Sequence, residues 1–144
     1  MFDTILIAID EDSHANEAVR IGGRLAEQLR SRVILFHVVR QPPTYALQAG
    51  FYLPPDELRK AATEHGKEVL EKAGAQLPDA VPSRLLVKYA DFSPWREIVQ
   101  LSERERADLI VLGAHSQGAL QRPTLGSTAE KVSRHVRVPI LLVR

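Results

Sequence analysis

Glycine and hydroxyl residues stand in the last third of the chain in a pattern that could bind a phosphate group. Gly113 closes an apolar segment, and Gly126, Ser127 and Thr128 precede a segment with helical spacing. Glycine lets the backbone approach an anion closely, and the first turn of a helix offers N–H donors at the positive end of its dipole. A simpler interpretation is also open, because Ser127 and Glu130 match the S-x-x-E pattern of a capping box, which needs no ligand.

An acidic triplet, Asp10, Glu11 and Asp12, follows the first apolar segment. Magnesium prefers carboxylate and phosphate oxygens, so the triplet could hold Mg²⁺ together with a bound nucleotide. Alternatively, these residues form a solvated turn whose charge favours the start of the next helix. We expect the turn for Glu11 and Asp12, and we expect Asp10 to face a ligand. We expect no metal site made by the protein alone.

The chain offers little for nucleophilic or acid–base catalysis. It contains no cysteine, which excludes disulfides, thiolate metal sites and cysteine nucleophiles. Its five histidines are scattered without the i, i+4 spacing of a helical metal site, and only His37 and His115 are placed to approach a ligand. Ser116 lacks the G-x-S-x-G context of a nucleophile elbow. We therefore assign no catalytic residue.

Short aliphatic segments alternate with segments of helical spacing along the whole chain. The aliphatic segments do not alternate with polar residues, which is typical of strands buried on both faces of a parallel sheet. These segments are residues 5–9, 32–39, 84–89, 108–112 and 138–143. The helical segments are expected to begin near Ala15, at Pro55, at Ser93-Pro94 and at Ser127, with a proline favoured at the first helical position.

This alternation predicts an α/β fold with one open parallel sheet and helices on both faces. Right-handed crossovers leave few topologies, and we expect a doubly wound, Rossmann-like sheet of five strands in the order 3-2-1-4-5. The length favours a single domain over residues 1–144. Ligands of such sheets bind at the carboxyl ends of the strands where the order reverses, here between the first and fourth strands. That edge would bring Asp10 close to Gly113 and Gly126.

Composition and charge exclude several classes of partner. The chain has 19 basic and 18 acidic residues, interspersed, and a formal net charge of +1. With this balance, the sequence shows no cluster of basic residues of the kind that binds nucleic acid. No apolar segment reaches membrane-spanning length, and the residues from Met1 to Thr4 lack the basic region of a secretory signal. We expect a cytoplasmic protein that binds neither nucleic acid nor membrane.

Two further segments could take part in interactions. The stretch from Arg40 to Leu53 follows the second strand and carries aromatic residues, so it could form a lid over a ligand or cover the core. The last strand, from Val138 to Val143, would be an apolar edge with unpaired backbone groups. Pairing of that edge with the same strand of a second copy would give a two-fold homodimer.

Four segments, in order and at matching spacing, resemble the universal stress protein family over essentially the whole chain: residues 5–10, 107–113, 126–132 and 138–144. The ATP-binding branch of that family carries G-x2-G-x9-G-[ST]. Here Gly113 and the pair Gly126-Ser127 match the motif, whereas Ser116 replaces the second glycine. The serine side chain takes up space beside the phosphates, although its hydroxyl could donate a hydrogen bond to one of them.

The resemblance implies the adenine nucleotide alpha hydrolase-like fold, a homodimer through the C-terminal strand, and ATP or AMP as ligand. Mg²⁺ could accompany the nucleotide. By this resemblance, eight residues would contact the nucleotide: Asp10, Val38, Leu112, Gly113, Ser116, Gly126, Ser127 and Thr128. The first four would surround adenine and ribose, and the last four would meet the phosphates. Two alternatives remain: a dimeric interaction protein of the same fold that binds no nucleotide, since some members lack the motif, and a slow ATPase.

Overall fold

The computed structural model describes residues 1–10, 13–40, 55–90, 93–114 and 125–144. Within these ranges five strands form one parallel sheet in the order β3-β2-β1-β4-β5, which confirms the predicted topology. The strands are β1 (Thr4–Ile9), β2 (Arg32–Val39), β3 (Ser83–Tyr89), β4 (Leu109–Gly113) and β5 (Ile140–Val143). β5 begins two residues later than predicted. Pro139 has no N–H to donate to the ladder, although its carbonyl accepts the N–H of Ile110 at 3.1 Å.

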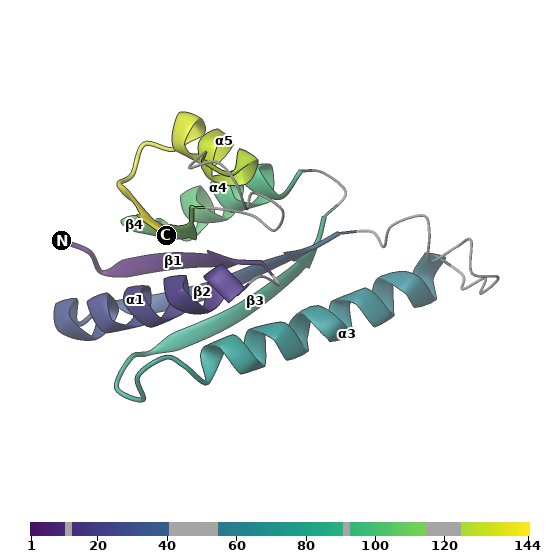
Figure 1. Cartoon of the computed structure of the whole chain (residues 1–144), viewed down its shortest axis with the longest axis horizontal. Helices are drawn as coiled ribbons and strands as arrows, with labels where there is room; N and C mark the ends of the chain where they lie inside the picture. The colour runs from purple at the N-terminus through teal and green to yellow at the C-terminus, as the bar shows by residue number, and fades with distance from the viewer. Residues whose placement is uncertain (11–12, 41–54, 91–92, 115–124) are drawn as a thin grey trace.

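Helices cover both faces of the sheet, as Figure 1 shows. α1 (Ser13–Leu29) and α3 (Pro55–Gly74) lie on one face, and α4 (Pro94–Arg104) and α5 (Ser127–His135) lie on the other. α4 begins where predicted, after Ser93. α3 ends at Gly74, and residues 75–77 form tight turns after it. None of the helices formed by the described residues has the length and apolar content needed to cross a bilayer.

The central strand β1 is buried along its whole length, which explains why its sequence is apolar throughout. Ile5, Ile7 and Ile9 pack in the layer between the sheet and helices α1 and α3. Leu6 and Ala8 pack in the opposite layer, under α4 and α5. Successive side chains therefore enter two separate cores, and neither face of the strand meets solvent.

Two helical glycines let their helices approach the sheet closely. A Cβ atom on Gly22 of α1 would lie 2.7 Å from Ile7 Cδ1. A Cβ atom on Gly66 of α3 would lie 2.4 Å from Val39 Cγ2 and 3.4 Å from His37 Cδ2. Because real Cβ atoms do not approach other atoms to 2.4 Å, α3 can occupy this position only with glycine at residue 66.

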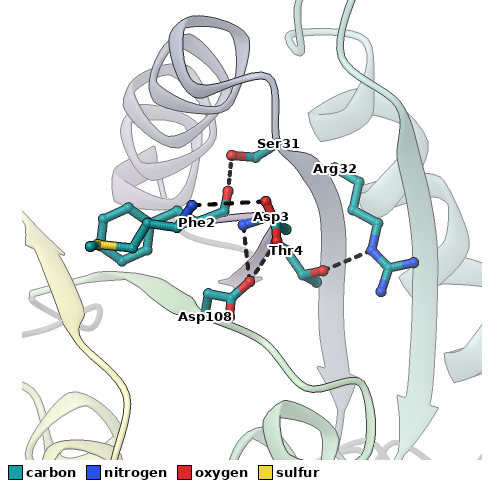
Figure 2. Close-up of polar contacts among 7 residues, drawn as sticks. Phe2, Asp3, Thr4, Ser31, Arg32 and Asp108 are labelled. Atoms are coloured by element: carbon teal, nitrogen blue, oxygen red, sulfur yellow. Dashed lines mark hydrogen bonds and ion pairs between the residues drawn. The ribbon is translucent and has the colours of Figure 1, made fainter.

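Polar contacts join the amino ends of the strands, as Figure 2 shows. The Asp108 carboxylate oxygen Oδ2 accepts the backbone N–H groups of Asp3 and Thr4, each at 2.9 Å. The Thr4 hydroxyl accepts a hydrogen bond of 2.7 Å from Nε of Arg32. These contacts link the starts of β1, β2 and β4. They hold the sheet together at the amino ends of its strands, on the opposite side of the sheet from the strands' carboxyl ends.

Candidate functional site

The carboxyl ends of β1, β2 and β4 lie side by side. Ile9 stands opposite His37 in the β1–β2 pairing, and Ala8 stands opposite Leu112 in the β1–β4 pairing. By these registers, Asp10 is level with Val38, one residue after His37, and with Ala114, two residues after Leu112. β1 and β4 are therefore neighbours at the point where the strand order reverses, which is where ligands bind in this type of sheet.

Four of the predicted nucleotide-binding residues come from these strand ends: Asp10, Val38, Leu112 and Gly113. Val38 and Leu112 pack on the face of the sheet that α4 and α5 cover, with Leu112 buried and Val38 half-buried. Asp10 is exposed directly after the end of β1. An apolar wall and an exposed carboxylate thus lie at the same edge, a combination suited to a ligand with an apolar ring and hydroxyl groups.

A backbone hydrogen bond fixes the start of α5 beside the end of β4. The N–H of Gly126 donates to the carbonyl of Ala114 at 2.7 Å, and the N–H of Ala114 donates to the carbonyl of Val143 at 2.7 Å. Ala114 directly follows Gly113, the last residue of β4. The first turn of α5 is therefore held next to the sheet edge that carries Asp10.

The first turn of α5 carries no side-chain cap. The capping-box interpretation is wrong, because the N-cap is Gly126 and Ser127 is already the first helical residue. The first N–H with an acceptor inside the helix is that of Glu130, which donates to the Gly126 carbonyl at 2.9 Å. The N–H groups of Ser127, Thr128 and Ala129 have no acceptor within the helix, and donors in this position, at the positive end of a helix dipole, suit an anion.

The site thus combines two kinds of polar group. The carboxylate of Asp10 accepts hydrogen bonds, whereas the backbone of the α5 start donates them. The hydroxyls of Ser127 and Thr128 add donors, Ser127 exposed and Thr128 half-buried. Such a site fits a molecule with hydroxyl groups at one end and an anionic group at the other. A nucleoside phosphate has this chemistry.

Several predicted groups lie outside the described residues: Ser116, Glu11, Asp12, His115 and residues 41–53. Within the described ranges, no group of three or more His, Asp or Glu side chains is arranged to hold a metal ion. The sequence predicted a carboxylate at this edge of the sheet, and among the described residues Asp10 is the predicted one that lies there.

The structure gives His37 a contact that the sequence did not predict. His37, at the end of β2, is 4% exposed, and its Nδ1 lies 2.9 Å from the carbonyl oxygen of Ile9. From the sequence, His37 was expected only to approach a ligand, as a histidine inside an otherwise aliphatic segment. The hydrogen bond depends on the register between β1 and β2, which the sequence does not show.

Comparison with known proteins gives one family. The model of the universal stress protein family matches residues 1–144. A universal stress protein of Thermus aquaticus is 32% identical over 144 residues, an alignment that covers 100% of both chains. Universal stress protein YxiE of Bacillus subtilis is 29% identical over 149 residues, again with 100% of both chains covered.

Solved structures share the fold. Hypothetical protein MJ0577 matches with a TM-score of 0.83 and 26% identity, over 99% of this chain and 96% of that chain. A universal stress protein in complex with cAMP matches with a TM-score of 0.67 and 20% identity, over 99% and 97%. A universal stress protein from Archaeoglobus fulgidus in complex with dAMP matches with a TM-score of 0.61 and 18% identity, over 100% of both chains.

Proposed function

The chain belongs to the universal stress protein family, and we propose that it is a regulatory module that binds an adenine nucleotide, ATP or AMP. The observation that carries the proposal is the start of α5. Its N–H donors lack a side-chain cap, and the bond from Gly126 to Ala114 holds them beside the edge that carries Asp10. Donors fixed in this way bind an anion without having to be reorganised first.

Each described group has a role in the proposed complex. The Asp10 carboxylate would accept hydrogen bonds from ribose hydroxyls or adenine, and the main chain of Val38 would meet the adenine ring. Leu112 and Gly113 would lie against the ribose. The phosphates would be held by Gly126, Ser127 and Thr128, joined by Ser116. Mg²⁺ would accompany the phosphates, since they supply the oxygen ligands that this ion prefers.

The ligands of related structures support this class of molecule. Two proteins of the same fold were solved with cAMP and with dAMP, which both contain adenine, a sugar and one phosphate group. The proposal extends this ligand class to the present chain. It assigns binding and orienting roles only, and no residue is proposed as a catalytic acid, base or nucleophile. The proposed place of action is the cytoplasm.

Calorimetry with ATP and AMP, each with and without Mg²⁺, tests the proposal on the full chain. We expect the wild-type chain to bind ATP weakly and Ser116→Gly to bind it more tightly, because glycine removes a side chain from beside the phosphates. Nucleotide released by denaturing freshly purified protein should be an adenylate. If neither the wild type nor Ser116→Gly binds ATP, the chain is instead a dimeric interaction protein that needs no nucleotide.

The proposed assembly is a homodimer of single-domain chains, each spanning residues 1–144. Among the described strands β5 pairs only with β4, so its outer edge has backbone groups that a second copy could pair with. Leu142 on this edge strand is 38% exposed. We expect light scattering to give a dimer mass for the full chain and a monomer mass, or unfolding, for a chain ending at Val136. A folded dimer of the shortened chain would contradict pairing through β5.

A further inference from the structure

His37, on the neighbouring strand β2, forms a hydrogen bond with the carbonyl of Ile9, the last residue of β1. Its Nδ1 lies 2.9 Å from the Ile9 carbonyl oxygen, and the two residues stand opposite each other in the β1–β2 register. A carbonyl oxygen only accepts hydrogen bonds, so Nδ1 is the protonated nitrogen and donates. His37 is 4% exposed, and this burial shields the hydrogen bond from competing water.

The imidazole lies on the face of the sheet away from the proposed nucleotide. Val38, the next residue, packs in the layer under α4 and α5. His37 instead lies under α3, where a Cβ on Gly66 would be 3.4 Å from its Cδ2. Because successive strand residues point to opposite faces, His37 cannot take the place of Val38 against the ligand. The printed geometry connects His37 to the site through its hydrogen bond with Ile9.

We propose that His37 is a positioning residue for the nucleotide site, an inference that rests on the proposed function. The Ile9 carbonyl and the Asp10 N–H belong to one planar peptide unit. A hydrogen bond to the carbonyl oxygen therefore fixes the orientation of the peptide plane between Ile9 and Asp10. The carboxylate of Asp10 is then held in the direction in which it meets the ribose or adenine, which raises affinity because less disorder is lost on binding.

Two substitutions separate this role from packing. His37→Asn places its Nδ2 donor as many bonds from Cα as Nδ1 of histidine, so it can keep the bond to Ile9. His37→Leu fills the space with an apolar group and removes the donor. Both variants disturb the packing under Gly66, and both are expected to unfold more easily than the wild type. A role in packing alone would therefore affect ATP affinity alike in the two variants.

The first readout is ATP affinity, measured by calorimetry on the full-length wild type, His37→Asn, His37→Leu and Val33→Ala. Val33 is 1% exposed at the opposite end of β2, so its truncation lowers stability without touching the site. We expect His37→Leu to bind ATP about tenfold more weakly than His37→Asn, the equivalent of one lost hydrogen bond. Val33→Ala should bind like the wild type.

The second readout needs no nucleotide. The carbonyl ¹³C chemical shift of Ile9, which responds to hydrogen bonding at its oxygen, should move upfield in His37→Leu and stay near the wild-type value in His37→Asn. Equal ATP affinity of the two variants, or an unchanged Ile9 shift in His37→Leu, overturns the positioning role even if the wild type binds ATP. Failure of the wild type to bind ATP overturns the proposed function itself, and the two failures are thus distinguishable.

Discussion

The Asp108→Ala variant is expected to unfold with a free energy about 2–3 kcal/mol below that of the wild-type chain. The Asp108 carboxylate accepts the N–H groups of Asp3 and Thr4, each at 2.9 Å, and the contact with Thr4 is partly buried. Alanine leaves both donors without this acceptor at the start of the fully buried strand β1. Equilibrium unfolding in urea, followed by circular dichroism, measures the change.

A matched control comes from the same end of the sheet. The Asp3 side chain is 93% exposed and lies 4.0 Å from the N-terminal amine, so Asp3→Ala should change the free energy of unfolding by less than about 0.5 kcal/mol. Equal effects of Asp3→Ala and Asp108→Ala would contradict the capping role of Asp108. Because this cluster lies opposite the proposed site, folded Asp108→Ala should bind ATP like the wild type.

The sheet and its order could be predicted because each depends on a local signal. β1 is buried on both faces, and that requirement makes its sequence apolar without alternation. α4 begins after Ser93, with Pro94 in its first turn, as the dipeptide indicates. Once the strands alternate with helices, the handedness of the crossovers leaves few possible orders.

The first residue of α5, Ser127, was predicted, but the way the start of this helix is held was not, because a contact distant in sequence determines it. Ser127 and Glu130 match a capping box locally, yet the Gly126 N–H bonds to Ala114 and the helix begins one residue earlier than that pattern requires. Asp108 is a similar case. Its carboxylate bonds to an N–H 104 residues away in the chain. Neither contact leaves a periodic pattern in the sequence.

The edge that carries Asp10 could be located from the sequence, but the way its residues are held could not. The reversal of strand order places Asp10 and Gly113 near one another in any sheet of this topology. The bond from His37 to Ile9 depends on the β1–β2 register, which is set by the packing of both faces and not by a local signal.

The second prediction with a large effect is that Ser127→Pro weakens ATP binding about tenfold or more, the equivalent of one charge-assisted hydrogen bond. Proline removes the N–H of Ser127 but is accepted at the first position of a helix. The residue before it must be extended, and Gly126 already is, with φ −60° and ψ 149°. Ser93, which precedes Pro94 in α4, has nearly the same geometry, with φ −61° and ψ 139°. The helix should therefore form normally.

Calorimetric titration of Ser127→Pro and Ser127→Ala with ATP and with adenosine tests most directly whether the α5 start holds the phosphates. Ser127→Ala keeps the backbone donor and loses only the hydroxyl, so it should bind ATP more tightly than Ser127→Pro. Adenosine, which has no phosphate, should bind both variants equally. If Ser127→Pro binds ATP as well as Ser127→Ala, or loses ATP and adenosine to the same extent, the phosphates do not lie at the start of α5.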